Sequence, residues 1–177
     1  MKKLSMDELN RLSKDEFKEI EKQSIIVLLD NIRSMHNIGS IFRSSDAFAI
    51  EAIILCGITA QPPHREIEKT ALGATESVQW WYEKDAIEAC NSLKAKGYKV
   101  LCIEQVENSI ALQNFKRNQD EKYVLVLGNE VEGVQQEIIN LADACIEIPQ
   151  FGTKHSFNVS VTAGIVLWEM CREEIKN

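Results

Sequence analysis

The residues best placed for chemistry lie in three polar segments, and the first of them combines an arginine with a glycine. It runs D-N-I-R-S-M-H-N-I-G-S-I-F-R-S-S-D-A-F (30–48), and Arg43 follows Gly39 by four residues, on one face of a predicted helix that Asn37 caps. A residue without a side chain beside a guanidinium leaves room for a bulky anion, and backbone N–H groups at the helix start would add donors. The alternative is an ordinary surface ion pair between Arg43 and Asp46, and the residues alone leave both readings open.

The second segment is L-G-N-E-V-E-G-V (127–134), which directly follows a predicted strand. Gly128 and Gly133 permit tight turns and a close approach of the backbone to a ligand, and Glu130 between them could accept hydrogen bonds. The spacing of the two glycines is that of a phosphate loop, but Val134-Gln135 stands where such a loop needs Lys-Ser or Lys-Thr. No dinucleotide-binding G-x-G-x-x-G is present here either. A plain solvated turn remains the alternative.

The third segment is I-P-Q-F-G-T-K-H-S-F-N-V-S-V (148–161), again after a predicted strand. Ser156, Asn158 and Ser160 place polar groups just before a long apolar helix. Capping of that helix by Asn158 would explain the segment without any catalysis.

These segments follow strands in a chain where strand and helix patterns alternate. That alternation predicts an α/β fold with a mostly parallel sheet and helices on both faces, and such sheets bind ligands at the carboxyl ends of their strands. The predicted strands are 24–30, 52–57, 77–82, 98–104, 122–128 and 144–149, and the predicted helices are 38–50, 85–97, 134–143 and 158–175. We therefore expect the three polar segments to share one edge of the sheet.

Residues 1–23 stand apart as an N-terminal helical extension to a domain that spans 24–177. Ser5 with Glu8 and Ser13 with Glu16 each have the spacing of a capping box, which predicts one or two short helices. The segment holds as many basic as acidic residues and has no apolar core of a secretory signal.

The composition excludes several classes of protein. Apolar residues form 45% of 177, enough for a core, yet no uninterrupted apolar run is long enough to span a membrane. Five widely spaced cysteines and three histidines predict neither a disulfide framework nor a metal site, and they fit the reducing cytoplasm. A net charge of −7 argues against a protein that coats nucleic acid, so any RNA would have to bind a local basic patch.

Taken in order, the three segments resemble the three motifs of the SpoU (TrmH) family of RNA ribose 2′-O-methyltransferases, part of the SPOUT superfamily. The first matches N-x-G-x-x-x-R, the second L-G-x-E-x-x-G, and the third I-P-M-x-G-x-x-x-S-L-N-V-S-V, with Gln150 in place of the methionine and Phe157 in place of the leucine. K-T-A-L-G-A (69–74) is also similar to the family. The resemblance covers residue 24 to about residue 170.

The resemblance implies a C-terminal deep trefoil knot, a homodimer, and S-adenosylmethionine held in the knot. It also implies the residues of the site. The catalytic set would be Arg43, Asn37, Glu130, Ser156 and Asn158. The cofactor would be held by Leu127, Gly128, Asn129, Glu130, Gly133, Ile148, Pro149, Gln150, Phe157, Asn158 and Val159. In the family the matching arginine is proposed to take the proton of the ribose hydroxyl. Because arginine normally stays protonated, the alternative is that Arg43 holds a phosphate and stabilises the alkoxide, and the residues alone leave both roles open.

The RNA would meet basic side chains that follow the strands. These are Arg33, His36, Arg43, Arg65, Lys154 and His155. The final helix is apolar on all sides, which independently favours a dimer, with Trp168 and Met170 needing a partner surface. The I-P-Q form of the third motif favours transfer RNA over ribosomal RNA. A non-catalytic RNA-binding or assembly protein on the same fold is the main alternative, and a different α/β nucleotide-binding enzyme is disfavoured by the missing fingerprints.

Overall fold

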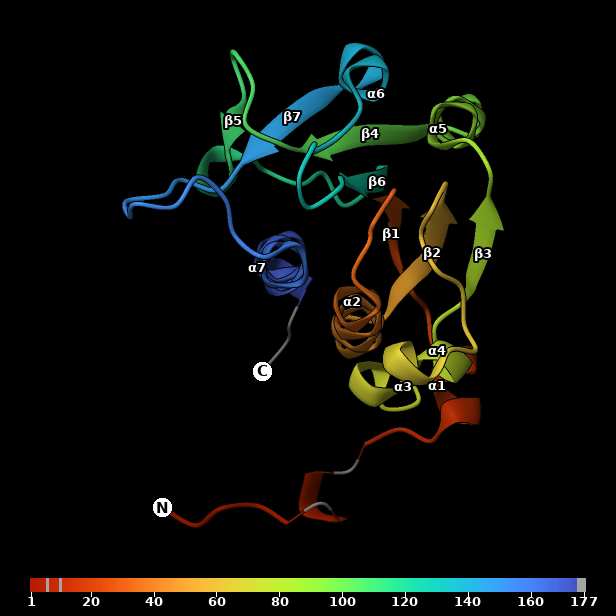
Figure 1. Ribbon diagram of the computed structural model, residues 1–177. Helices are drawn as coiled ribbons and strands as arrows, with labels where there is room; N and C mark the ends of the chain where they lie inside the picture. The colour runs from red at the N-terminus through yellow and green to blue at the C-terminus, as the bar shows by residue number, and fades with distance from the viewer. Residues whose placement is uncertain (6, 10, 175–177) are drawn as a thin grey trace.

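The computed structural model describes residues 1–5, 7–9 and 11–174, and within them a parallel sheet separates two layers of helices (Figure 1). The sheet order is β3-β2-β1-β6-β4-β7-β5, and every pairing is parallel. The strands are β1 (Gln23–Asp30), β2 (Ile50–Cys56), β3 (Trp80–Glu83), β4 (Tyr98–Ile103), β5 (Ile110–Ala111), β6 (Lys122–Leu127) and β7 (Ala144–Glu147). The predicted α/β class with a parallel sheet is confirmed.

The helices of the described chain are α1 (Lys14–Glu19), α2 (Met35–Ala47), α3 (Arg65–Ala71), α4 (Ala74–Ser77), α5 (Ala86–Ala95), α6 (Gln136–Leu141) and α7 (Val159–Cys171), with 3₁₀ turns η1 (Asp7–Leu9), η2 (Leu112–Asn114) and η3 (Arg172–Glu174). Most of these helices lie between consecutive strands, although α3 and α4 follow one another and no described α-helix separates β4, β5 and β6. None of the described helices combines the length and apolarity that crossing a bilayer requires.

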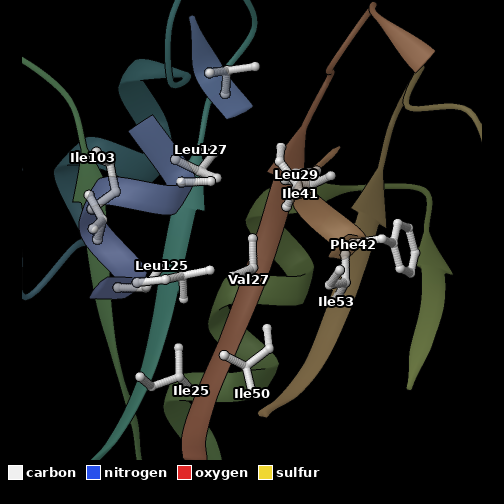
Figure 2. Close-up of a cluster of buried hydrophobic side chains, with 14 of the residues drawn as sticks. Ile25, Val27, Leu29, Ile41, Phe42, Ile50, Ile53, Ile103, Leu125 and Leu127 are labelled. Carbon is white, nitrogen blue, oxygen red and sulfur yellow. The ribbon is translucent and has the colours of Figure 1, made fainter. Parts of the chain in front are cut away.

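Alternate residues of the central strands feed two separate cores. Ile25, Val27 and Leu29 of β1 point to the layer of α2 and α7, as Figure 2 shows, whereas Ile26 and Leu28 pack with residues of α5 and α6. A strand buried on both faces must be apolar throughout, which explains why continuous apolar runs predicted strands so well.

The last strand, β7, lies between β4 and β5, two strands that precede it and are consecutive along the chain. Its insertion brings the segment after β7 beside the ends of β4 and β6, and the chain then returns across the sheet as α7, which packs on α2. The edge strand β5 has only two residues, and both of them pair with β7, the neighbouring strand in the sheet.

Several element boundaries differ from the sequence predictions. Residues 77–79 belong to the end of α4 and the turn after it, so the aromatic strand begins at Trp80. The helix predicted from 38 begins at Met35, the one predicted from 134 begins at Gln136, and the final helix ends at Cys171 before η3. Residue 175, its predicted last residue, lies outside the described residues. Helices α3 and α4 were not predicted.

The N-terminal segment contains both expected capping boxes. Ser13 and Glu16 cap α1 reciprocally, and Ser5 and Glu8 form the same pair of contacts around η1. Phe17 is the buried anchor of α1, and Lys14 forms an ion pair with Glu76 of α4. The division into an extension and a main domain stays a prediction.

Candidate active site

Glu130 ties the loop after β6 to the loop after β1. Its carboxylate accepts hydrogen bonds from the backbone N–H of Arg33 at 2.9 Å and of Ser34 at 3.0 Å. Two backbone donors on one carboxylate fix the path of the first loop just before α2 begins. Partial burial opposes ionisation of this carboxyl, but the hydrogen bonds from Arg33, Ser34 and Asn37 outweigh it and hold the pKa of Glu130 below its ordinary value.

Asn37 extends this connection to the third loop. Its side-chain nitrogen donates to Glu130 at 3.0 Å, and its side-chain oxygen accepts from the side-chain nitrogen of Asn158 at 3.0 Å. Asn37 is buried, with only 8% of it exposed, whereas Glu130 and Asn158 are exposed, so both contacts are partly buried. The three polar segments therefore meet through one chain of side chains, Glu130–Asn37–Asn158.

Asn37 is not the helix cap that the sequence predicts. Ser34 caps α2, with its hydroxyl accepting from the backbone N–H of Asn37, and Asn37 sits inside the first helical turn. The side chain of Asn37 is thereby free for the contacts with Glu130 and Asn158. Asn158 does cap α7, as predicted, through its oxygen and the backbone N–H of Ser160.

The second loop is a tight hairpin whose glycines approach its own backbone. Asn129 and Gly133 exchange two backbone hydrogen bonds, of 3.0 and 2.9 Å, and a Cβ on Gly128 would lie 2.2 Å from the carbonyl carbon of Gly133. Gly133 has a φ of +72°. Asn129 also donates to the backbone oxygen of Asn31 at 2.8 Å, which links this hairpin to the first loop a second time.

A cavity of about 650 Å³ lies between the second and third loops, within the size range of small-molecule sites. Its walls combine apolar side chains from the ends of β4, β6 and β7 with the carboxylates of Glu104, Glu130, Glu132 and Glu147. The predicted cofactor residues that line it are Leu127, Gly128, Asn129, Glu130, Gly133, Ile148, Gln150, Phe157, Asn158 and Val159. Pro149 does not line it. The predicted catalytic residue Ser156 does.

Glu104 and Gln105 line this cavity but were missed by the sequence reasoning. Glu104 accepts from the backbone N–H of Val134 at 3.0 Å, and so supports the second loop from the end of β4. Gln105 donates to the backbone oxygen of His155 at 2.9 Å, and so supports the third loop. Glu104 is the last residue of the predicted strand 98–104 and Gln105 follows it, so the preference of ligands for the carboxyl ends of parallel strands is the signal that points to both.

Gly39 serves helix packing rather than an anion. A Cβ at this position would lie 2.2 Å from the backbone oxygen of Ile67 and 2.2 Å from the hydroxyl of Thr70, because α3 lies directly against α2 there. The space that the sequence suggested for a phosphate beside Gly39 is therefore filled by α3. Thr70, from the K-T-A-L-G-A segment, donates to the backbone oxygen of His36 at 3.0 Å and helps to hold the two helices together.

Arg43 stands apart from the other predicted catalytic residues. It is exposed on α2, does not line the cavity, and makes no ion pair or hydrogen bond within the described residues. Within the described residues, Arg43 does not form the alternative ion pair with Asp46. The carboxylate of Asp46 instead accepts a hydrogen bond from the hydroxyl of Ser77. Arg43 lies seven residues after His36, on the same face of α2.

The predicted RNA-binding residues are all exposed, on α2, α3 and the first and third loops. They are Arg33, His36, Arg43, Arg65, Lys154 and His155. His36 is not free of acidic neighbours, since its ring nitrogen lies 2.9 Å from Glu66, which also pairs with Lys69 at 2.7 Å. Within the described residues, no three His, Cys, Asp or Glu side chains gather as a metal ion would require.

This geometry agrees with comparisons to known proteins. Residues 24–168 match the model of the SpoU rRNA Methylase family. The chain belongs to this family. The family prediction is therefore confirmed over residues 24–168.

Three relatives show the range of the family. The chain is 28% identical to a 23S rRNA (guanosine-2′-O-)-methyltransferase of Neisseria meningitidis, over 91% of this chain and 63% of that protein. It is 31% identical to a tRNA (guanosine(18)-2′-O)-methyltransferase of Aquifex aeolicus, over 88% of this chain and 72% of that protein. The solved AdoMet-bound rRNA methyltransferase of Sinorhizobium meliloti superposes with a TM-score of 0.80 at 26% identity, over 91% and 61% of the two chains.

The likeness to solved SpoU structures implies a C-terminal knot, as the sequence resemblance does, and the insertion of β7 between β4 and β5 is compatible with one. The chain spans less than two thirds of the length of the Neisseria and Sinorhizobium proteins.

Proposed function

We propose that this protein transfers a methyl group from S-adenosylmethionine to a ribose 2′-hydroxyl of RNA. The observation that carries the proposal is the Glu130–Asn37–Asn158 chain, which joins all three family motifs beside one cavity. A non-catalytic RNA-binding protein would have no need of this network next to a cavity of cofactor size.

The residues of the cavity fit S-adenosylmethionine. Apolar side chains such as Ile103, Leu127 and Ile146 would pack on the adenosine, and the carboxylates of Glu132 and Glu147 suit its positive charges. Backbone groups of the second and third loops also line this cavity. When bound, the cofactor would supply an electrophilic methyl group on a sulfonium: as a positioned hydroxyl oxygen forms the O–CH₃ bond, the S–CH₃ bond would break to leave a neutral thioether, and the hydroxyl proton would pass to the RNA phosphate or to solvent.

The chain's own residues would position the hydroxyl and stabilise its charge. Glu130, Asn37 and Asn158 hold the three loops in one arrangement, so the reacting groups need little reorganisation. Ser156, at the cavity wall, would contact the reacting ribose. Arg43, exposed and unpaired within the described residues, would hold an RNA phosphate bidentately and stabilise the developing alkoxide.

Transfer RNA is the favoured substrate. The Ile148-Pro149-Gln150 form of the third motif supports it, whereas the relatives do not discriminate, because they include tRNA and rRNA enzymes at similar identity, 31% and 28%. Mapping of 2′-O-methyl groups in cellular RNA, with and without the gene, tests both the reaction and the substrate. Loss of a site in ribosomal RNA alone would reject transfer RNA.

Cofactor binding separates the proposed enzyme from the non-catalytic alternative. Calorimetry of the purified protein should show binding of S-adenosylmethionine, and Arg43→Ala should bind it equally well while failing to methylate. Binding of RNA without binding of S-adenosylmethionine would instead support the alternative of a non-catalytic RNA-binding protein. Lys96→Ala, on the opposite edge of the sheet, serves as the control.

We further propose a homodimer that buries the outer face of α7. Val161, Ile165 and Trp168 lie at helical spacing on this face, and Val161 and Trp168 are 49% and 51% exposed. Met170, which the sequence assigned to a partner surface, is instead buried within its own chain. Sedimentation equilibrium should give a dimer at micromolar concentration, and Val161→Lys should dissociate it. A wild-type monomer would reject the proposal.

A further inference from the structure

The third loop carries a phenylalanine that contributes nothing to the core. Phe151 is 99% exposed, more than any other aromatic residue of the described chain. Single exposed apolar residues are common on proteins, but a whole aromatic ring in water forgoes a large favourable burial. A Cβ added to its neighbour Gly152 would meet no atom within 4 Å, so the loop is open at that residue as well.

The loop that presents this ring is anchored at its base. Gln105 and Gln150 both donate to the backbone oxygen of His155, at 2.9 and 3.4 Å, and Asn158 fixes the end of the loop as the cap of α7. Between these anchors the segment that joins β7 to α7 projects away from both helical layers (Figure 1). The ring is therefore held out from the body by a supported loop.

The chemistry of the same loop favours a polyanion with flat faces. Lys154 and His155 lie three and four residues after Phe151, and residues 150–157 include no acidic side chain, although the whole chain has a net charge of −7. The loop is also continuous with the candidate active site, because Gln150, Ser156 and Phe157 line its cavity. A cation beside an exposed ring is the combination by which proteins hold single-stranded nucleic acid.

We propose that Phe151 is a stacking platform for an unpaired base of the RNA substrate, with Lys154 contacting a neighbouring phosphate. This inference rests on the proposed function and adds a substrate class to it, RNA with unpaired nucleotides at the site. A base within a duplex has both faces covered by its neighbours, so only an unpaired base can offer a face to the ring.

A second copy of the chain fits this loop less well than RNA does. Burial of Phe151 against a protein would also withdraw Lys154 from water, which is costly unless an acidic partner is supplied. The apolar stripe proposed for the dimer, Val161, Ile165 and Trp168, lies on α7 and not on this loop.

The test compares variants of Phe151 in binding a hairpin RNA with an unpaired loop and the blunt duplex of the same stem. Phe151→Ala should weaken hairpin binding by about 5- to 150-fold, the range for loss of one stacked base. Phe151→Trp should preserve binding, and Phe151→Leu, which is apolar but not aromatic, should fail like Phe151→Ala. Binding to the duplex and to S-adenosylmethionine should not change.

The salt dependence of binding tests the role of Lys154. Lys154→Ala should lower the slope of log affinity against log salt by about one unit, since one phosphate contact is lost. Lys96→Ala removes the same charge from the C-terminal end of α5 and should leave the slope unchanged.

Four results would each overturn the inference. Three of them are a wild type that fails to bind the hairpin, a Phe151→Ala variant that binds it equally well, and a Phe151→Leu variant that binds it like the wild type. The fourth is a change of sedimentation in Phe151→Ala, which would place the ring against a second copy. The proposed function would fail separately, by a wild-type protein that neither binds S-adenosylmethionine nor methylates RNA.

Discussion

The side-chain nitrogen of Asn158 donates a 3.0 Å hydrogen bond to the side-chain oxygen of Asn37, 121 residues earlier in the chain. Asn37 in turn donates to Glu130, so its amide must present nitrogen to one partner and oxygen to the other. No carboxylate can do this, because an ionised carboxylate only accepts. The site therefore specifies asparagine at position 37 by hydrogen-bond polarity.

Asn37→Asp should destabilise the protein although it keeps the shape of the side chain. The new carboxylate would lose the donation to Glu130 and place a like charge beside it, at a cost of about 1–3 kcal/mol. Urea denaturation at neutral pH should show the loss, and the loss should shrink in acid as the new carboxyl takes up a proton and donates again. Asn91→Asp, which adds the same charge to an exposed position of α5, is the control. Equal stability of the two variants would contradict the assigned polarity.

Glu130 should make stability depend on pH in the acid range. Its pKa is lower in the folded protein than its ordinary value, so its contribution is complete above the unfolded pKa of about 4.3 and is lost as pH falls through the folded pKa. Glu130→Gln should therefore lose stability at neutral pH and approach the wild type as the solution is acidified. Urea midpoints from neutral pH to about pH 3 measure this. The control is Glu137→Gln, on the exposed face of α6, whose urea midpoint should change with pH in the same way as that of the wild type.

Much of the fold was predictable because burial on both faces forces apolar runs. Most strands fall within two or three residues of their predicted ends, and the three polar segments do share one edge of the sheet, as expected. The knot came only with the family resemblance, since strand patterns carry no information on how β7 is inserted between β4 and β5.

The site could be predicted as a set of loops but not as a set of contacts. Two of the donors to Glu130 are backbone N–H groups, which every residue except proline possesses, so the sequence cannot single out Arg33 and Ser34. The sequence also predicted room for an anion beside Gly39, where the structure places α3, because it did not indicate that helix. Helix α3, which fills the space beside it, is only seven residues long and depends on tertiary packing, so its sequence gave no clear periodic signal.

Alanine substitutions at a matched pair of glycines can test whether Gly39 serves the packing of α2 against α3. Gly39→Ala should destabilise the protein by about 1–3 kcal/mol, because the added methyl group overlaps the backbone oxygen of Ile67. Gly164→Ala in α7 meets only the hydroxyl of Ser44, at 3.9 Å, and should be neutral or stabilising by about 0.5–1 kcal/mol. Urea denaturation of both variants gives the comparison. If Gly39→Ala kept full stability but lost RNA affinity, the space beside Gly39 would belong to an anion after all.

The role of Arg43 in the reaction can be tested by two substitutions, Arg43→Ala and Arg43→Lys. Arg43 is exposed and unpaired within the described residues, and it lies outside the cavity lining, so its guanidinium is available to a ligand that arrives from solvent. If it holds a phosphate in two-point contact and stabilises the alkoxide, Arg43→Ala should abolish methylation even at saturating RNA. Arg43→Lys should also fail, because an ammonium keeps the charge but not the planar fork of donors. Both variants should bind S-adenosylmethionine normally, since the residue does not line the cavity. Single-turnover methylation isolates the chemical step from RNA binding and product release. A wild-type rate for Arg43→Lys would show that charge alone suffices, and a wild-type rate for Arg43→Ala would remove Arg43 from the reaction.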